Sequence, residues 1–517
     1  MSSKAKKNSA NGSIKIALLH MEIEKGHPEK NMKTLLALAR RAGSLGAKIV
    51  CAPELCLSGY SFDNYKEAYK NAQAEGNWAF KSLSSLAKEI DAFVTAGILE
   101  RHGTYAIVYN SAFAFGPNGK LVCRYRKINS EPHWAAPGAP SQQNVFQTPW
   151  GGVGLLICSD SYHALLARTT TVKGACLIVL PSNWPNSKDD FPNILWRQRA
   201  RENGVWLAAV NRCGREPEID FSNSKSSLID FHGNLATALK ESDQNLSLFE
   251  IPLNSQGFIP NQREKKLESR VLKHFHPLYA NFNSVKDVTS LLDLPKPGPV
   301  EVKAVVSGQD DPLAFLWPKV KKFKSNTIVL LPRFHYNKKE LSKFLAKALL
   351  LNIHVFGCDG DSDSHYNYFL QISNQGKPKN IKPNFKPWFI GDCGPVRVIF
   401  GPLEILDHPE AAVVAAKSGV DLALCPASEL SDDDLDLVAL RPIEQLAVCS
   451  CGLNAGAFYG IPRSEGLGPG AKVKAGEILS FSFNSIQTRE KRFQERIDYE
   501  ALFSKPVDKS AWSYDNF

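Results

Sequence analysis

Three residues far apart in the 517-residue sequence, Glu54, Lys127 and Cys158, have side chains suited to acyl transfer through a covalent intermediate. A cysteine attacks a carbonyl carbon as the thiolate, and a neighbouring carboxylate can take the thiol proton and later activate water. A lysine ammonium beside that carboxylate can stabilise the negative oxygen of a tetrahedral intermediate. The backbone N–H of Ser159, directly after the cysteine, is a second candidate donor to that oxygen.

Each of these three residues lies at the end of a segment typical of a β-strand. Glu54 ends "KIVCAPE", Lys127 ends "CRYRK" and Cys158 follows "GLLI". Ligands of α/β proteins bind at the carboxyl ends of strands, so these positions favour a site. Each residue also has a simple structural interpretation, as a solvated acid, an exposed hairpin edge or a small core residue. Only the combination of the three indicates catalysis.

The first 255 residues alternate short apolar segments with amphipathic ones. Hairpins are predicted with turns at "PNGK" and "HGN". Strands that alternate with helices predict an α/β domain whose sheets are covered by helices. The main strands are predicted at residues 14–20, 48–54, 93–100, 152–160 and 176–184, and the first helix at 31–47.

The order of these segments recurs in the second half of the chain. "NTIVLLPRF" (326–334) resembles "AKIVCAPEL", and four further segments follow in the same order. The copy ends, "QREKKLESRVLKHF" (262–275) and "TREKRFQERIDYEALF" (488–503), both contain R-E-K and an arginine seven residues after the first. We predict a tandem repeat with a leader at 1–12, a catalytic domain at 13–290, a proline-rich linker at 291–299 and a shortened second domain with a C-terminal tail at 300–517.

Composition excludes several classes of protein. No apolar run approaches the about 18 residues of a membrane span, and the polar start of the chain does not match a secretory signal. The net charge is +10, but Lys and Arg are scattered, so we expect no nucleic-acid partner. The eleven cysteines show no CxxC pair and no zinc spacing. Free thiols of this kind predict a reducing, cytoplasmic compartment.

With these motifs the chain resembles the nitrilase (carbon–nitrogen hydrolase) superfamily over roughly residues 14–255. The family's Glu-Lys-Cys triad matches "APELCLSGY", "YRK" and "LLICSD", and so maps onto Glu54, Lys127 and Cys158. "EPHWAAPG" fits the pattern of a second glutamate in the family. The resemblance implies that this residue, Glu131, holds Lys127 and helps to position the substrate; a plain loop carboxylate is the alternative interpretation.

The resemblance also implies a fold and an arrangement. The family fold is an α-β-β-α sandwich, and its members dimerise to extend the sandwich. The repeat therefore predicts tandem sandwiches packed as an intramolecular pseudo-dimer. In the second copy Arg333 aligns with Glu54, and no cysteine occurs at residues 401–403, where Cys158 would align. We expect this copy to be non-catalytic and to take the place of a partner subunit, and whether the chain assembles into a further homo-oligomer is left open.

The residues around the nucleophile bear on the reaction. "CSD", which includes Asp160, resembles the amidase and carbamoylase branches of the family, where nitrilases proper resemble C-W-E. "YHAL" (162–165) replaces the common R-F-P-E, and the loss of that arginine argues against a substrate with a carboxylate. Four further side chains could line the site and favour an apolar or planar substrate, or could simply pack: Tyr60, Trp134, His163 and Trp184.

We therefore expect a hydrolase that cleaves an amide or N-carbamoyl bond of a small molecule through a thioester on Cys158. No metal, organic cofactor, nucleic acid or membrane is expected to take part. Hydrolysis of a nitrile, or transfer of the acyl group to an amine or thiol, would use the same covalent route. A non-catalytic scaffold is the alternative from another class, although the first copy keeps the whole triad.

Overall fold

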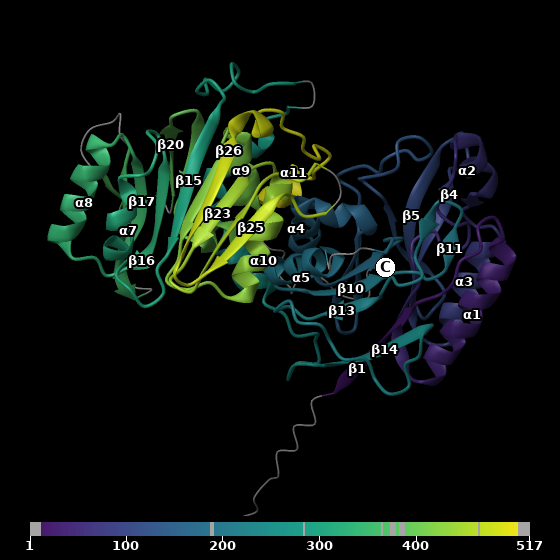
Figure 1. Cartoon of the computed structure of the whole chain (residues 1–517). Coiled ribbons are helices and arrows are strands. Elements are labelled where there is room, and N and C mark those ends of the chain that lie inside the picture. The colour runs from purple at the N-terminus through teal and green to yellow at the C-terminus, as the bar shows by residue number, and fades with distance from the viewer. Residues whose placement is uncertain are drawn as a thin grey trace, which may run out of the picture. The chain divides into compact units, whose positions relative to one another are not determined.

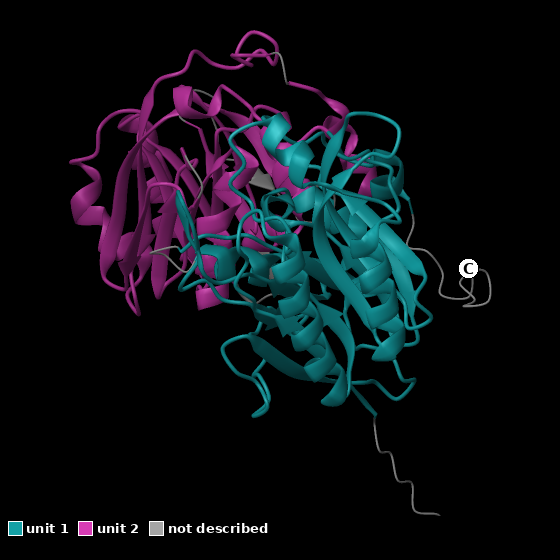
Figure 2. Ribbon diagram, turned by 90° about the vertical axis from the view of Figure 1, so that its right-hand side faces the viewer, with its two compact units in different colours: residues 1–270, 496–517 teal, residues 271–495 magenta. Residues whose placement is uncertain are grey.

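The computed structural model describes residues 12–186, 191–282, 285–362, 365–372, 379–381, 388–463 and 466–504. The predicted leader, except for its last residue, and the predicted tail beyond residue 504 lie outside the described residues. The chain divides into two compact units, shown in two colours in Figure 2. Unit 1 comprises Met1–Arg270 and Arg496–Phe517, and unit 2 comprises Val271–Glu495. The domain borders at 291–299 remain a prediction of the sequence.

Unit 1 contains two main sheets, here called sheet I and sheet II, and a small pair, β11 (Arg215–Glu216) and β12 (Ile219–Asp220). Sheet I has the order β14 (Leu246–Pro252), β1 (Ser13–Leu19), β2 (Ala47–Cys51), β4 (Phe93–Arg101), β5 (Val108–Phe115) and β6 (Leu121–Arg126), with β3 (Gln73–Ala74) beside β4. Sheet II has the order β13 (Ser227–Ile229), β10 (Trp206–Val210), β9 (Ala175–Pro181), β8 (Gly151–Leu155) and β7 (Val145–Thr148). The central strands of both sheets are parallel, as helical crossovers require.

Helices cover the outer faces of the two sheets in unit 1 (Figure 1), so the unit has four layers in the order α-β-β-α. The helices of this unit are α1 (Pro28–Ser44), α2 (Tyr65–Asn71), α3 (Trp78–Glu89), α4 (Ala164–Val172), α5 (Phe191–Asn203), α6 (Arg263–Glu268), α11 (Tyr499–Phe503) and the 3₁₀ turn η1 (Cys158–Tyr162). In Figure 1, α1 and α3 lie on the side of sheet I, and α4 and α5 lie on the side of sheet II. The predicted α/β class is confirmed.

Alternating side chains of the strands fill two separate cores. In β1, Ala17 and Leu19 join Leu35 of α1 in the core beneath the helices. Their neighbours Ile16 and Leu18 are equally buried but point to the opposite face, since successive strand residues alternate. Covered on both faces, such strands become continuous apolar runs, which is why "IKIALL" shows no polar alternation.

The strands that lead to the predicted catalytic residues end earlier than the sequence indicated. β2 ends at Cys51, β6 at Arg126 and β8 at Leu155, so Glu54, Lys127 and Cys158 follow their strands rather than end them. After β2, Pro53 has no N–H for the ladder, and Leu55 is left-handed with φ 49°. Cys158 is also left-handed, with φ 43°, and opens η1. The backbone therefore turns at two of the three positions.

Unit 2 also has two sheets, here called sheet III and sheet IV. Sheet III has the order β19 (Lys379–Ile381), β18 (His365–Gln371), β17 (His354–Ser362), β16 (Ile328–Phe334), β15 (Pro299–Val306) and β26 (Glu477–Asn484). Sheet IV has the order β20 (Phe389–Cys393), β21 (Val396–Phe400), β22 (Leu422–Pro426), β23 (Ala447–Cys451), β24 (Ala455–Tyr459) and β25 (Gly470–Lys474). A core between the two sheets contains Val302, Phe356, Phe400 and Leu424.

Helices cover the outer faces of sheets III and IV as well (Figure 1). They are α7 (Pro312–Val320), α8 (Lys338–Leu350), α9 (Pro409–Lys417) and α10 (Asp432–Leu440), with the 3₁₀ turns η2 (Leu272–His274), η3 (His276–Tyr279), η5 (Leu403–Asp407), η6 (Arg441–Glu444) and η7 (Ser485–Thr488). The core of sheet III with α7 and α8 includes Leu316 and Phe344. The core of sheet IV with α9 and α10 includes Ala412 and Leu437.

The strand order of each main sheet of unit 2 matches that of its counterpart in unit 1, with β25 as an added edge strand, whereas β3 and the pair β11 and β12 of unit 1 have no counterpart among the described residues. β15 pairs antiparallel with β26 and parallel with β16, as β1 does with β14 and β2. Ile328 of β16 lies opposite His354, as Ile49 of β2 lies opposite Phe93. Arg333 and Glu54 each follow that isoleucine by about five residues, so Arg333 occupies the position of Glu54. The turn η5 follows β21 as η1 follows β8, and it begins with Leu403 where η1 begins with Cys158.

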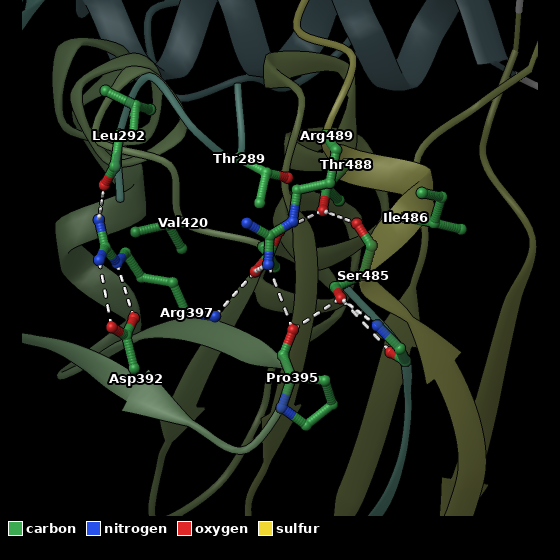
Figure 3. A network of polar contacts seen from close by, with 12 residues as sticks. Thr289, Leu292, Asp392, Pro395, Arg397, Val420, Ser485, Ile486, Thr488 and Arg489 are labelled. Carbon is green, nitrogen blue, oxygen red and sulfur yellow. Dashed lines mark hydrogen bonds and ion pairs between the residues drawn. The ribbon is translucent and has the colours of Figure 1, made fainter. Parts of the chain in front are cut away.

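A buried polar network ties the end of β26 to sheet IV within unit 2 (Figure 3). Arg489 donates to a carboxylate oxygen of Asp421 at 2.9 Å and to the carbonyl oxygen of Pro395 at 3.2 Å. Thr488 donates to the second oxygen of the same carboxylate, and Ser485 donates to Pro395 at 2.7 Å. These contacts use the R-E-K segment that ends the second copy, so the motif has a structural role there.

Candidate active site

Glu54 is fully buried and its carboxylate has two unlike oxygens. Oε1 accepts hydrogen bonds from Asn110 Nδ2 at 2.7 Å and from Lys127 Nζ at 2.8 Å. Oε2 has no hydrogen-bond partner among the described residues. Burial raises the pKa of Glu54, although Lys127 opposes this shift. A carboxylate with a raised pKa and one uncommitted oxygen is suited to take and return a proton.

Lys127 lies directly after β6 between two carboxylates. Its ammonium contacts Glu54 and Glu131, and its backbone N–H donates to the carbonyl oxygen of Asn110 at 2.8 Å. Burial alone would lower the pKa of Lys127, but Glu131 and Glu54 outweigh burial and raise it well above the usual value. The ammonium therefore stays charged, and it is fixed in place from two sides.

Glu131 is held by three side chains. Besides Lys127, it accepts a hydrogen bond from the Tyr60 hydroxyl at 3.1 Å and from Asn110 Nδ2 at 3.2 Å. Its side chain is 11% exposed, more than either Lys127 or Glu54. Trp134 packs edge-on against Tyr60, with ring centroids 6.1 Å apart. The structure thus brings four of the sequence-predicted residues together. Glu54 and Glu131 contact the ammonium of Lys127, and Tyr60 contacts Glu131.

Cys158 opens η1 with its backbone in the left-handed region, which is rare for a residue with a Cβ and marks functional turns. Burial and the nearby Glu54 carboxylate raise the pKa of the Cys158 thiol well above its usual value. Lys127 and the backbone N–H of Asn183 act in the opposite direction. The thiol is therefore protonated in the resting site, and its proton must move before the sulfur can attack.

Asp160 fixes the turn that carries Cys158. Its carboxylate accepts hydrogen bonds from the N–H of Ile157 at 3.1 Å, the N–H of Asn129 at 2.8 Å and the Tyr125 hydroxyl at 2.9 Å. Burial raises the pKa of Asp160 to about 6, and these donors oppose the shift. Ser159 Oγ donates to the carbonyl oxygen of Asn129 at 3.1 Å. The turn is therefore tied to the segment that directly follows Lys127.

Two further predicted pocket residues, Trp184 and His163, lie next to the end of η1. Trp184 is buried against Tyr162, with ring centroids 5.2 Å apart, and against Trp196 at 5.6 Å. Burial lowers the pKa of His163 to about 4, with a smaller contribution from Arg199, so this imidazole is neutral at pH 7. The structure places Trp184 in an aromatic cluster with Tyr162 and Trp196, whereas Tyr60 contacts Glu131 and packs against Trp134.

Sequence reasoning did not identify two asparagines of this site. Asn110 lies in β5 and bridges Glu54 and Glu131, and Asn183 follows β9 and donates to the backbone carbonyl of Glu54 at 3.1 Å. The signal for Asn110 is a polar residue inside the apolar strand "VYNSAFAF". The signal for Asn183 is its place shortly after the end of a strand, the fully buried β9, because Glu54, Lys127 and Cys158 also follow the ends of strands.

The described residues contain no group of three or more His, Cys, Asp or Glu placed to hold a metal ion. In the same part of the chain, every helix is too short or too polar to span a bilayer.

Comparison with known proteins identifies a family for unit 1. The profile of the carbon-nitrogen hydrolase family matches residues 15–260. A nitrilase of Pyrococcus abyssi (strain GE5 / Orsay) is 30% identical over 247 residues, which are 46% of this chain and 90% of the relative. Omega-amidase NIT2 of Homo sapiens is 29% identical over 212 residues, 38% of this chain and 74% of the relative. A 2-oxoglutaramate amidase of Paenarthrobacter nicotinovorans is 28% identical over 220 residues, 40% and 72% of the two chains.

Solved structures are similar over about the same length. Saccharomyces cerevisiae Nit3, a member of branch 10 of the nitrilase superfamily, matches with a TM-score of 0.42 and 22% identity over 47% of this chain and 90% of that chain. An amidase from Nesterenkonia sp. matches with a TM-score of 0.41 and 21% identity over 50% and 94%.

The match to the Pyrococcus nitrilase extends over nine tenths of that protein, and the family profile matches the same region of unit 1. The predicted resemblance is therefore confirmed, and the chain belongs to the carbon-nitrogen hydrolase family.

Proposed function

We propose that unit 1 hydrolyses an amide or N-carbamoyl bond of a small molecule through a thioester on Cys158. The observation that carries this proposal is the buried contact of Glu54 Oε1 with Lys127 Nζ at 2.8 Å, which leaves the second oxygen of Glu54 without a partner among the described residues. A charged lysine and a carboxylate with a free oxygen, both acting electrostatically on one thiol, are the groups that acyl transfer to cysteine requires.

The reaction would begin with transfer of the Cys158 proton to Glu54. The thiolate attacks the carbonyl carbon of the substrate, and the carbonyl electron pair moves onto oxygen. Lys127 and the N–H of Ser159 stabilise this oxyanion. The intermediate collapses to a thioester as ammonia or an amine leaves with the proton from Glu54. Glu54 then takes a proton from water, whose oxygen attacks the acyl carbon; the C–S bond breaks, the acid leaves, and the proton on Glu54 returns to the sulfur of Cys158.

The raised pKa of the thiol favours this order of steps. A resting thiolate would need a depressed pKa, but burial and Glu54 raise the pKa of Cys158. The pKa of Glu54 is raised as well, so this carboxylate is a stronger base than an ordinary glutamate and better suited to accept the thiol proton. Glu54 would therefore act as general base when the substrate arrives.

An amide or carbamoyl substrate is supported by the residues after the nucleophile. Asp160 follows Cys158 by two positions and holds η1 through three donors. Relatives named omega-amidase and 2-oxoglutaramate amidase are 29% and 28% identical to this chain over 212 and 220 residues. A nitrile, or transfer to an acceptor amine or thiol, would use the same groups, and product analysis with and without an added acceptor separates these reactions.

The first experiment is alkylation with iodoacetamide, with each labelled cysteine located by peptide mass spectrometry. All eleven cysteines are free, and ten other thiols therefore serve as internal controls. We expect Cys158 to react fastest in the wild type and much more slowly in Glu54→Gln. Uniform labelling that does not depend on Glu54 would contradict the proposal and favour a non-catalytic scaffold. Cys158→Ala should abolish turnover of amides with the fold intact.

We further propose that unit 2 is a degenerate copy of unit 1 that serves as its intramolecular partner. The matching strand order supports a common origin. Arg333 and Leu403, at the positions of Glu54 and Cys158, cannot act as base and nucleophile. A fragment of residues 1–290 should be insoluble or inactive; a soluble fragment with full activity would remove this idea. The eleven free cysteines support a reducing, cytoplasmic location.

A further inference from the structure

Residues 55–61 form a loop that directly follows Glu54 and contains Tyr60 near its end. The loop therefore connects two parts of the candidate site. The loop starts with a left-handed residue, Leu55, and reverses again at Gly59, which has φ 80°. A Cβ at Gly59 would lie 3.0 Å from Oε1 of Glu216, a residue of β11 far along the chain. The same Cβ would lie 2.9 Å from Cα of Lys25, so the positive φ of Gly59 and the close approach of the backbone of Lys25 favour glycine here, and the loop packs closely against Glu216.

The Glu216 carboxylate accepts hydrogen bonds from three donor groups at the end of this loop, and the N–H of Tyr60 reaches both of its oxygens. The N–H of Tyr60 donates to Oε1 at 3.0 Å, and the N–H and hydroxyl of Ser61 donate to Oε2 at 2.8 and 2.5 Å. The side chain of Glu216 is 1% exposed. Burial opposes its charge, but Arg212 and the Ser61 and Tyr60 donors outweigh burial and lower the pKa of Glu216. The anchor is thus an ionised carboxylate with four donors.

Arg212 ties this carboxylate to the body of unit 1. Its Nη1 forms a buried ion pair with Glu216, its Nη2 donates to the carbonyl oxygen of Ile23, and its Nε donates to that of Cys213 at 3.2 Å. The guanidinium also lies over the ring of Phe221, 4.8 Å from its centre. With five possible donors in a fixed plane, an arginine in this setting has little freedom to shift. The loop end is therefore held by a rigid group.

The loop end leads to the reacting groups through one side chain. The Tyr60 hydroxyl donates to Oε1 of Glu131 at 3.1 Å, and the same oxygen contacts the ammonium of Lys127. Lys127 in turn donates to Glu54 at 2.8 Å. A shift of the Tyr60 backbone would change the contact between the Tyr60 hydroxyl and Glu131. Glu131 could then move, and with it the position of the Lys127 ammonium between Glu131 and Glu54.

We infer that Glu216 is a positioning residue for the reaction: it holds the backbone of Tyr60 so that the Tyr60 hydroxyl restrains Glu131, and thereby Lys127, beside Glu54. The inference rests on the proposed function of the site. Misplacement of a catalytic group by about 1 Å can cost roughly a hundredfold in rate, so a remote anchor can control turnover without touching the substrate.

The test compares Glu216→Gln, Glu216→Asp, Tyr60→Phe and the double variant Glu216→Gln/Tyr60→Phe in the full-length protein. We expect Glu216→Gln to lower kcat roughly 10- to 100-fold with little change in KM. Glu216→Asp keeps the charge and should recover part of this loss. Because Glu216 would act through Tyr60, the double variant should be no slower than the slower single variant.

A control variant separates positioning from stability. Asp421→Asn removes a buried carboxylate that is also held by an arginine and a backbone N–H, in the network of unit 2 shown in Figure 3. It should lower the melting temperature as Glu216→Gln does, with kcat unchanged. If Glu216 has only a structural role, Glu216→Gln will show the same pattern, a lower melting temperature with kcat within twofold of wild type, and the inference is overturned. Strictly multiplicative losses in the double variant also overturn it.

A second measurement does not depend on the substrate. The rate of Cys158 alkylation by iodoacetamide reports on Glu54 and Lys127 without turnover, and it should fall in Glu216→Gln but stay at the wild-type value in Asp421→Asn. Equal rates in wild type and Glu216→Gln overturn the inference whatever the substrate proves to be. A wild-type protein that hydrolyses no amide, but shows the expected difference in alkylation, counts against the proposed function and leaves the positioning role supported.

Discussion

Asn110 and Glu54 are joined by a buried hydrogen bond of 2.7 Å, and the same Nδ2 group of Asn110 reaches Glu131 at 3.2 Å. One amide thus holds both carboxylates that flank Lys127. A hydrogen bond to a charged group contributes about 1.5–3 kcal/mol. We expect Asn110→Ala to lower kcat roughly 10- to 100-fold, measured as ammonia release at saturating amide. Asn64→Ala, which removes only the exposed cap of α2, should leave kcat unchanged; an Asn110→Ala enzyme as fast as this control would contradict the prediction.

Removal of the ammonium should destabilise unit 1 in a pH-dependent way. Lys127→Met leaves Glu54 and Glu131 close together without their cation, which costs about 3–5 kcal/mol for a buried pair. Burial already raises the pKa of Glu54, and loss of Lys127 raises it further. The folded variant then binds a proton that the unfolded chain releases, so its stability should increase as the pH falls from 8 to 5.5.

Chemical denaturation at the two pH values checks this prediction. Lys48→Gln breaks the exposed contact with Asp91 and should change the free energy of unfolding by less than about 1 kcal/mol at either pH. The double variant Lys127→Met/Glu54→Gln should recover stability, because it removes the buried charge. A loss of stability in Lys127→Met that is the same at both pH values would count against a buried, ionised Glu54.

A buried lysine in unit 2 should make stability rise with pH. Lys491 donates to the carbonyl oxygens of Val420 at 2.9 Å and Gln445 at 2.7 Å, and burial lowers its pKa to about 7 despite the nearby Asp421. The unfolded chain, with a lysine pKa of 10.5, therefore binds more protons than the folded chain between about pH 7 and 10.5. The free energy of unfolding should increase with pH across this range.

Thermal unfolding of wild type and Lys491→Met at pH 7 and pH 9.5 tests this sign. The difference in melting temperature, wild type minus variant, should increase with pH, because methionine does not titrate. Lys472→Met, at an exposed position of β25, serves as the control and should show no such increase. A difference for Lys491→Met that does not change with pH would mean that the ammonium is solvated in the folded state.

The last described helix should be a necessary part of the catalytic unit. α11 packs against α4, Asp498 contacts Lys173 at 2.8 Å, and Arg270 donates to the carbonyl oxygen of Leu502 at 2.7 Å. Leu502 is fully buried, so Leu502→Ala should lower the free energy of unfolding by about 2–5 kcal/mol. Glu500→Ala, at an exposed position of the same helix, should cost less than about 0.5 kcal/mol. Equal unfolding curves for the two variants would show that α11 adds no stability.

The elements of unit 1 could be predicted because their signals are local. The helix predicted at 31–47 is α1 at Pro28–Ser44, since one stripe of apolar residues repeats at helical spacing. The strand predicted at 93–100 matches β4 (Phe93–Arg101), but the strands predicted at 48–54 and 152–160 are too long at their carboxyl ends. Buried residues continue beyond the strand ends at Cys51 and Leu155, so hydrophobicity does not mark where pairing stops ahead of the turns at Leu55 and Cys158.

The types of Glu54, Lys127 and Cys158, with the motifs around them, were enough to name a site and a family from the sequence. Only the tertiary structure shows that Glu216 contacts the Tyr60 loop, that Asn110 bridges two acids, and that the segment after Glu495 belongs to unit 1. The physical reason is that a hydrogen bond depends on distance and direction in space, and residues separated by tens or hundreds of positions leave no pattern along the chain when they form one.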